Sequence, residues 1–183
     1  LKVPGAHNRK NAQAAIALAD VLGIDSAKAI EALDDFAGTW RRFEFKGGTQ
    51  NGAIVYDDYG HHPTEVKATL AGAREKFPDR KITVVFQPHL YSRTKILLDD
   101  FAHSFNDADE VIIAPIYAAR EPFDPSITSE MLADKIKETH KSVASLPDFK
   151  SIEKHLKHEL RHGDILITMG AGDVYKVGEL LIQ

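Results

Sequence analysis

The sequence predicts an α/β protein. After its first forty residues, the chain repeats one unit, a short β-branched run, then a polar or glycine-rich loop, then an amphipathic helix, and this alternation is typical of α/β folds. The β-branched runs are nearly continuous in apolar residues, which indicates a sheet covered on both faces. We therefore expect a Rossmann-like architecture, with a mostly parallel sheet and helices on both faces.

The first forty residues differ in character, because they carry two helical segments and no confident strand. The helices are expected at residues 8–22 and 26–36, and small apolar side chains recur at helical spacing in the first. We interpret residues 1–40 as the helical end of a preceding domain and residues 41–183 as one α/β domain. The apolar helix faces are expected to pack on that domain or on a second copy of the chain.

A junction at residues 38–42 leads into the α/β part, where Gly47-Gly48 and Asn51-Gly52 are typical of hairpin turns flanking a short edge strand. Pro63 suits a first helical turn, where its missing N–H costs nothing. The expected strands are residues 53–56, 82–86, 111–114, 142–145 and 165–168. The expected helices are residues 63–76, 94–105, 129–139, 152–160 and 174–181.

Composition narrows the class of protein. The 183 residues carry a formal charge of −4, with Lys and Arg dispersed along the chain, so a nucleic-acid partner is not expected. The chain has no cysteine, which excludes disulfides and thiolate zinc sites and fits a reducing compartment. No run approaches the roughly 18 apolar residues that span a bilayer. We expect a soluble, cytoplasmic protein that does not bind membranes.

One nine-residue stretch, Asp57-Asp58-Tyr59-Gly60-His61-His62-Pro63-Thr64-Glu65, carries more chemistry than any other. It joins a strand to a helix at the carboxyl end of the strand, where ligands bind in open α/β sheets. We interpret the two aspartates as holding a ribose hydroxyl or a metal ion, and the imidazoles of His61 and His62 as donors to phosphate or carboxylate oxygens. A solvated loop is the alternative, although such a loop needs neither imidazoles nor a phenol.

Two stretches near the N-terminus suit nucleotide binding. In Gly5-Ala6-His7-Asn8-Arg9-Lys10-Asn11, the carboxamides of Asn8 and Asn11 share one helix face and could pair with an adenine edge. Asn8 could equally cap the helix. In Arg41-Arg42-Phe43-Glu44, a guanidinium could bind phosphate oxygens, or the arginines could be solvated junction residues.

Two further loops follow expected strands on the same sheet edge. In Gln87-Pro88-His89-Leu90-Tyr91-Ser92-Arg93-Thr94, His89 and Arg93 could hold a small carboxylate, and a plain connector is the alternative. In Met169-Gly170-Ala171-Gly172-Asp173, Gly170 and Gly172 could let backbone amides approach an anion, although glycine turns after strands are common.

Two other polar segments are given structural interpretations. The stretch of residues 117–125 could line a pocket, but we favour a segment that wraps the third strand. Three histidines, His155, His158 and His162, stand at helical spacing. They are more simply solvated than metal ligands, because their helix is rich in lysine and glutamate.

Taken together, in this order and spacing, these motifs resemble the Mur ligases of bacterial peptidoglycan synthesis along the whole chain. The resemblance implies a family with three domains, of which this chain holds the end of the central ATPase domain and the C-terminal Rossmann-like domain. The Gly-rich phosphate-binding loop of the family is absent from these residues, and no residue here is assigned to a metal. We therefore expect the chain to start in mid-domain, to lack most of the Mg²⁺ site and to be inactive alone.

The resemblance implies ATP-dependent amide formation through an acyl phosphate. The peptide-recycling member of the family usually has Phe-Ala where Tyr59-Gly60 stands here, so the resemblance favours the member that uses ATP, UDP-N-acetylmuramate and L-alanine. The recycling member, with a peptide acceptor, is the alternative within the family. A nucleotide-binding module that has lost its chemistry is the alternative outside it.

The resemblance also implies residue roles. Asn8 and Asn11 contact the adenine, with His7 close to the nucleotide, and Arg42 and Asp58 reach its phosphate or ribose. Tyr59 and His61 lie with Asp58 by the reacting groups, and His89 and Arg93 bind the alanine carboxylate. We place His62, Gly170 and Gly172 with the substrate-binding residues. Some members carry an arginine where this chain has Leu90, and Arg120 is a candidate substitute.

Overall fold

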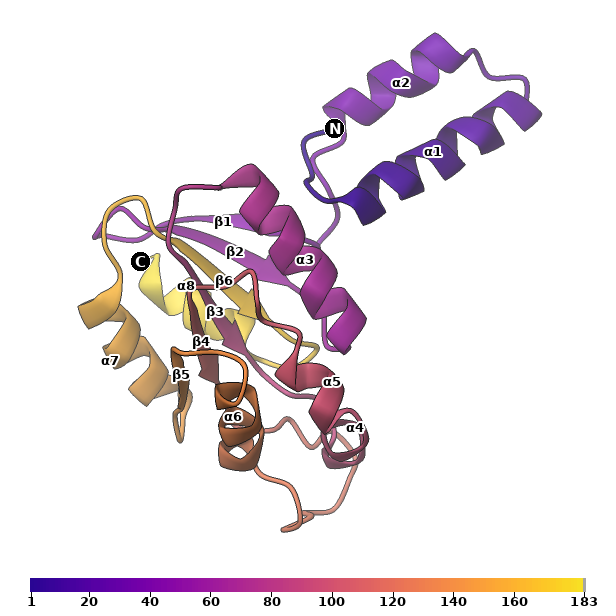
Figure 1. Ribbon diagram of the computed structural model, residues 1–183. Helices are drawn as coiled ribbons and strands as arrows, with labels where there is room; N and C mark the ends of the chain where they lie inside the picture. The colour runs from indigo at the N-terminus through magenta and orange to yellow at the C-terminus, as the bar shows by residue number, and fades with distance from the viewer. Residues whose placement is uncertain (183) are drawn as a thin grey trace.

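The computed structural model describes residues 1–182, which form a six-stranded sheet with helices on both faces and a helical hairpin at one end (Figure 1). The strand order is β1 (Glu44–Gly48), β2 (Ile54–Asp58), β6 (Ile165–Met169), β3 (Ile82–Phe86), β4 (Glu110–Ile113) and β5 (Val143–Ser145). β1 is antiparallel to β2, and the other neighbouring strands are parallel. The predicted α/β, mostly parallel architecture is confirmed.

The sheet separates two apolar cores, because successive strand residues point to opposite faces. In β3, Val84 and Phe86 belong to one core and Val85 to the other. The first core packs under α3 (Pro63–Lys76), α5 (Leu98–Ala102) and α6 (Ser129–Lys137). The second packs under α7 (Phe149–Glu159) and α8 (Tyr175–Leu181). Strands buried on both sides account for the continuous apolar runs in the sequence.

Most predicted elements are present, and two predictions are wrong. The helix expected at residues 94–105 is interrupted at Leu97 (φ −102°, ψ 18°) and forms α4 (Tyr91–Ile96) and α5. Gly47 and Gly48 lie inside β1, at a register shift, and not in a turn. The turn is at residues 49–52, where Gly52 N–H donates to the Thr49 carbonyl at 2.9 Å.

The first two helices, α1 (Ala6–Val21) and α2 (Ser26–Asp35), form an antiparallel hairpin that projects away from the sheet (Figure 1). Asp25 caps α2 by accepting the Ala27 N–H at 3.0 Å. Near the start of α1, Arg9 pairs with Glu75 of α3 at 2.7 Å. Farther along, Val21 is 82% exposed. The hairpin therefore does not pack on the α/β part beyond the first turns of α1, and packing on a second copy of the chain stays a prediction.

Within residues 1–182, no helix combines the length and the hydropathy that a bilayer crossing requires.

We predict that backbone amides of α1 and α2 exchange with solvent far faster than those of β2, β3 and β6. The strands are buried under helices, whereas the hairpin buries few apolar side chains, and local opening free energy follows burial. Hydrogen exchange followed by NMR on residues 1–183 measures both sets in one sample. Equal protection of hairpin and strands would contradict the exposed arrangement.

Candidate active site

β2 ends in two carboxylates that point to opposite faces of the sheet. The predicted strand stopped at Tyr56, and the structure extends it by two residues, through Asp58. Asp57 continues the alternation of Val55, on the α8 side, and Asp58 continues that of Tyr56, on the α3 side. Asp57 is 1% exposed and Asp58 is 5% exposed. The end of β2 therefore places one buried carboxylate on each face of the sheet.

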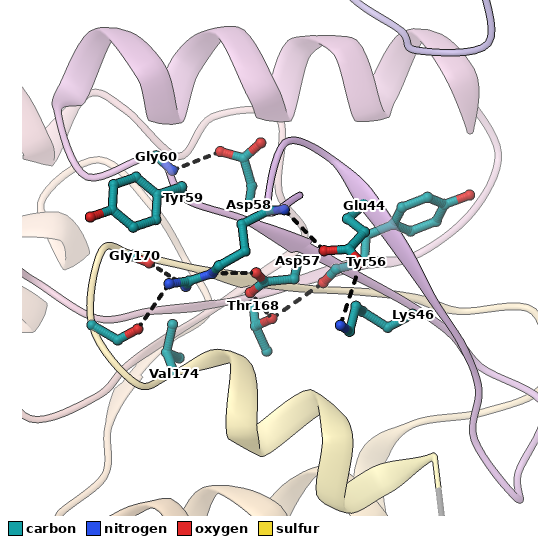
Figure 2. Close-up of polar contacts among 12 residues, drawn as sticks. Glu44, Lys46, Tyr56, Asp57, Asp58, Tyr59, Gly60, Thr168, Gly170 and Val174 are labelled. Carbon is teal, nitrogen blue, oxygen red and sulfur yellow. Dashed lines mark hydrogen bonds and ion pairs between the residues drawn. The ribbon is translucent and has the colours of Figure 1, made fainter. Parts of the chain in front are cut away.

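Asp57 is fully engaged within the protein. Arg41 Nε donates to Asp57 Oδ2 at 2.7 Å, and the Thr168 hydroxyl donates to Asp57 Oδ1 at 2.7 Å. Figure 2 shows Asp57 beside Thr168 and Gly170 in this network. Burial raises the pKa of Asp57, and the hydrogen bonds from Arg41 and Thr168 oppose that rise. The prediction that Asp57 holds a ribose or a metal ion is wrong, because Asp57 is buried, pairs with Arg41 and Thr168, and does not line the cavity that Asp58 lines.

Asp58 holds the turn that carries Arg42. Its carboxylate accepts the N–H of Phe43 at 2.9 Å and that of Gly60 at 2.8 Å. Arg41 and Phe43, on either side of Arg42, have left-handed φ values of 53° and 48°, a conformation that costs about 1–3 kcal/mol per residue. Burial raises the pKa of Asp58, whereas the two N–H donors and Arg42 lower it. The carboxylate thus stabilises a strained turn.

A cavity of about 690 Å³ lies between the start of the hairpin, α3 and this turn. All five residues predicted to surround the nucleotide line it, namely His7, Asn8, Asn11, Arg42 and Asp58. Asn8 Nδ2 donates to the Pro4 carbonyl at 2.7 Å, so its carboxamide oxygen remains to face a ligand. The alternative that Asn8 caps α1 does not hold, because Gly5 occupies the cap position.

His62 belongs to the start of α3. It occupies the N-cap position, and its Nδ1 accepts the Thr64 N–H at 3.3 Å. Glu65 closes the capping box by accepting the N–H of His61 at 2.9 Å and that of His62 at 3.1 Å. Burial opposes ionisation of Glu65, but these hydrogen bonds and nearby His61 lower its pKa. The predicted donor role for His62 is therefore restricted to Nε2.

A second cluster gathers on the neighbouring strand ends. The rings of His61 and His89 lie 5.5 Å apart, and Tyr59 packs edge-on against His61 at 5.5 Å. Arg93 Nη1 donates to His89 Nδ1 at 3.1 Å. Tyr117 stacks on the His89 ring, with the ring centroids 5.6 Å apart. The structure thus brings together Tyr59, His61, His89 and Arg93, four of the residues to which the resemblance assigns roles.

The contacts fix the tautomers of both histidines in their neutral forms. Arg93 can only donate, so His89 Nδ1 accepts and Nε2 carries the proton. His61 Nδ1 lies 3.0 Å from the Tyr59 carbonyl, which can only accept, so Nδ1 carries the proton and Nε2 keeps its lone pair. Burial lowers the pKa of His89, with further lowering by Arg93 and His61 against an opposing effect of Glu121. His89 is therefore a neutral donor at pH 7.

The glycines after β6 have a packing role. Gly170 N–H is already donated to the Asp58 carbonyl at 3.0 Å, so its amide is not open to an anion as predicted. The carbonyls of Gly170 and Gly172 accept from Arg41 Nη2 and Nη1 at 2.6 and 3.1 Å. A Cβ on Gly172 would lie 2.7 Å from Tyr117 Cγ. These residues are glycines because protein atoms approach them closely.

Sequence reasoning missed Arg41 and Tyr117. Arg41 stands next to Arg42 with no local signal to tell a buried arginine from an exposed one, and the structure buries the first and exposes the second. The segment that contains Tyr117 is expected to wrap the third strand, with a pocket-lining role as the alternative, and in the structure its ring stacks on His89. Arg120 is exposed in the loop that follows.

The three histidines of the α7 region point to separate partners. His155 pairs with Glu110 and His158 with Glu159, and His162 lies against Gly52. In the described part of the chain, no group of three His, Cys, Asp or Glu side chains could hold a metal ion.

The family model for the Mur ligase glutamate ligase domain matches residues 41–172. The chain belongs to the Mur ligase family. It is 50% identical over 184 residues to a UDP-N-acetylmuramate–L-alanine ligase of Acetivibrio thermocellus, an alignment that covers 100% of this chain and 39% of the relative. The chain thus spans about two fifths of the length of the curated relatives it matches.

Solved structures agree with this assignment. A UDP-N-acetylmuramate–alanine ligase from Thermotoga maritima superposes with a TM-score of 0.83 at 33% identity, covering 100% of this chain and 38% of that one. A murein peptide ligase from Psychrobacter arcticus gives 0.66 at 30% identity, with coverages of 97% and 36%.

We predict that Asp57→Asn lowers the free energy of unfolding by about 3 kcal/mol or more, because it leaves the Arg41 cation buried without its partner. Urea unfolding of residues 1–183 measures the loss. Asp134→Asn is the matched control, since Asp134 pairs with Lys137 on the exposed side of α6 and such pairs contribute about 0–1 kcal/mol. Equal small effects of both substitutions would contradict a buried ion pair.

We also predict that His89 titrates below the usual histidine value of about 6.5, and that Arg93→Met raises its pKa. The unfolded chain takes up this proton first on acidification. The contribution of His89 to the free energy of unfolding is therefore complete above about pH 6.5. It is lost as the pH falls through the lower pKa that His89 has in the folded chain. NMR titration of the His89 ring tests both statements. A value at or above 6.5 in the unsubstituted chain would contradict them.

Proposed function

We propose that this chain is the C-terminal part of an ATP-dependent ligase that joins L-alanine to the muramoyl carboxylate of UDP-N-acetylmuramate. The observation that carries the proposal is that the site residues form two groups, one around a cavity and one in a side-chain cluster. The five residues expected around a nucleotide line one cavity. Two residues expected by the reacting groups, Tyr59 and His61, form one side-chain cluster with the two expected at the alanine carboxylate, His89 and Arg93. The names of the relatives supply the substrate class.

The reaction has two steps. A carboxylate oxygen of the muramoyl group attacks the γ-phosphorus of ATP, and ADP leaves. The amine nitrogen of alanine then attacks the acyl carbon, phosphate leaves, and the amine gives up its proton. Mg²⁺, held mainly by the part of the ligase that this chain does not contain, would neutralise phosphate charge in the first step.

The cavity residues supply the nucleotide contacts in this proposal. The carboxamides of Asn8 and Asn11 meet the adenine edge, and His7 lies close to the nucleotide. Arg42 is exposed on its turn within the cavity, so its guanidinium is free to reach phosphate oxygens. Asp58 contributes by holding that turn and by its position at the cavity wall.

The cluster residues supply the amino-acid contacts. Arg93 offers a guanidinium to the alanine carboxylate, and the Nε2 proton of His89 adds a second donor. His61 offers an Nε2 lone pair that can accept the proton released by the attacking amine. Because the two imidazoles are 5.5 Å apart, they can contact the amine and the carboxylate of one small amino acid. Tyr59 fixes the ring of His61.

Alanine-dependent phosphate release is the experiment that tests this function. In a full-length ligase carrying this chain, ATP and UDP-N-acetylmuramate should release phosphate only when L-alanine is present, and residues 1–183 alone should release none. The tripeptide L-Ala-γ-D-Glu-diaminopimelate is the comparison acceptor. Preference for the tripeptide would identify the peptide-recycling activity instead, and release indifferent to either acceptor would contradict the proposal.

Since ATP and UDP-sugars are cytoplasmic metabolites, we place the enzyme in the cytoplasm.

We predict that Arg93→Ala in the full-length ligase raises the KM for L-alanine roughly ten- to hundredfold, because it removes a charge-assisted hydrogen bond to the carboxylate. The KM for ATP should change little, since Arg93 is not among the residues that line the nucleotide cavity. Lys137→Ala, which removes an exposed cation from α6, is the control. Steady-state kinetics with L-alanine and ATP varied in turn measures both KM values. An unchanged KM for alanine would remove Arg93 from the site.

A further inference from the structure

The guanidinium of Arg41 has no free surface for a ligand. Its three nitrogens donate to Asp57, Gly170 and Gly172. Its Cζ atom lies 5.0 Å from the centroid of the Tyr59 ring and 4.8 Å from that of the Tyr175 ring, and its side chain is 4% exposed. Arg41 therefore cannot bind phosphate, even though it stands next to Arg42 in the sequence. Whatever it contributes to the site must come through the residues it holds.

Those residues lead to the amino-acid cluster by two routes. In the first, Arg41 packs on Tyr59, Tyr59 packs edge-on against His61, and the His61 ring lies against His89. In the second, Arg41 fixes the carbonyls of Gly170 and Gly172, and Gly172 lies against the Tyr117 ring that stacks on His89. Both routes end on the same imidazole, that of His89.

The nucleotide side of the turn has its own supports. Asp58 accepts the Phe43 N–H, Glu44 accepts the Arg41 N–H at 2.9 Å, and the Arg41 carbonyl accepts the Tyr59 N–H at 2.7 Å. None of these bonds uses the Arg41 side chain. The turn that carries Arg42 is therefore held without the Arg41 side chain, although the Arg41 carbonyl also helps to hold Tyr59.

We propose that Arg41 is a positioning residue for the incoming amino acid. It holds Tyr59 against the His61 ring, and it holds the loop of residues 170–172 against Tyr117, whose ring stacks on His89. This inference rests on the proposed function for its kinetic consequence, but the geometry stands independently of it. The role requires arginine. A lysine could keep the charge beside Asp57, but it has neither the planar fork that reaches two carbonyls nor a face that stacks on two rings.

The test is Arg41→Lys, with Arg74→Lys as a matched control. Arg74 also donates to several backbone carbonyls and to one aspartate, Asp109, but it serves the opposite end of the sheet. Two readouts are used: the NMR titration of His89 in residues 1–183, and the KM values and kcat of the full-length ligase. The charged and titratable groups facing His89, namely His61, Arg93 and Glu121, are unchanged in both variants.

For Arg41→Lys, we expect the His89 pKa to rise toward its ordinary value and the KM for L-alanine to rise at least about tenfold. The kcat should fall, since a misplacement of about 1 Å can cost about a hundredfold, and the KM for ATP should stay within about threefold. Arg74→Lys should leave all four quantities unchanged while lowering the melting temperature. Tyr175→Leu, which removes one of the rings beside the Arg41 guanidinium, should raise the His89 pKa by a smaller amount. This variant replaces Arg41→Lys if Arg41→Lys does not fold.

An unchanged His89 titration in both Arg41→Lys and Tyr175→Leu, with only a lower melting temperature, would overturn the proposal. So would a rise in the KM for ATP alone. If the unsubstituted ligase shows no alanine-dependent phosphate release, the proposed function fails, whereas the titration of His89 still decides whether Arg41 positions the cluster.

Discussion

The ion pair between Arg41 and Asp57 is the interaction on which the site depends. Burying two charges costs several kcal/mol per ion unless the remaining hydrogen-bonding groups are satisfied. Here they are satisfied, by Thr168 on the carboxylate and by two glycine carbonyls on the guanidinium. The pair connects the junction after the hairpin, the end of β2 and the loop after β6, which are far apart in the sequence.

The alternation of β2 explains how one strand end supports two kinds of chemistry. Asp57 and Asp58 are adjacent, so they point to opposite faces, and each anchors a different part of the turn at residues 41–43. On one face, Asp57 buries Arg41. On the other, Asp58 supports the turn that exposes Arg42 in the cavity proposed for the nucleotide. The amino-acid cluster begins immediately afterwards, at Tyr59 and His61.

Much of this arrangement could be predicted from the sequence, because it depends on local signals. Continuous apolar runs predicted the sheet, and Pro63 with its capping residues predicted the bounds of α3 without error. The motif residues were expected at one sheet edge because parallel strands share their carboxyl ends. The five residues that the resemblance assigned to the nucleotide line one cavity, whereas their roles and those of the His89 cluster stay predictions.

The remaining features depend on tertiary contacts that leave no local pattern. Nothing near Arg41 or Asp57 in the sequence indicates that each is neutralised by the other, 16 residues away. The same is true of Gly170 and Gly172, whose carbonyls and small size matter more than their amides. No Pro or Gly near Leu97 indicates that the predicted helix is interrupted there. Gly47 and Gly48, which are typical of a turn, lie in a strand instead. Buried polar partners are the part of the site that sequence reasoning identifies least well.

A double-mutant cycle tests the central role of this pair most directly. The free energy of unfolding is measured for residues 1–183, for Arg41→Met, for Asp57→Leu and for the double variant. Each single substitution leaves one buried charge unpaired, whereas the double removes both charges. The account predicts that the double variant is more stable than either single variant, with a coupling energy of at least about 2 kcal/mol. Additive losses would contradict it, because they would mean that Arg41 and Asp57 do not depend on each other.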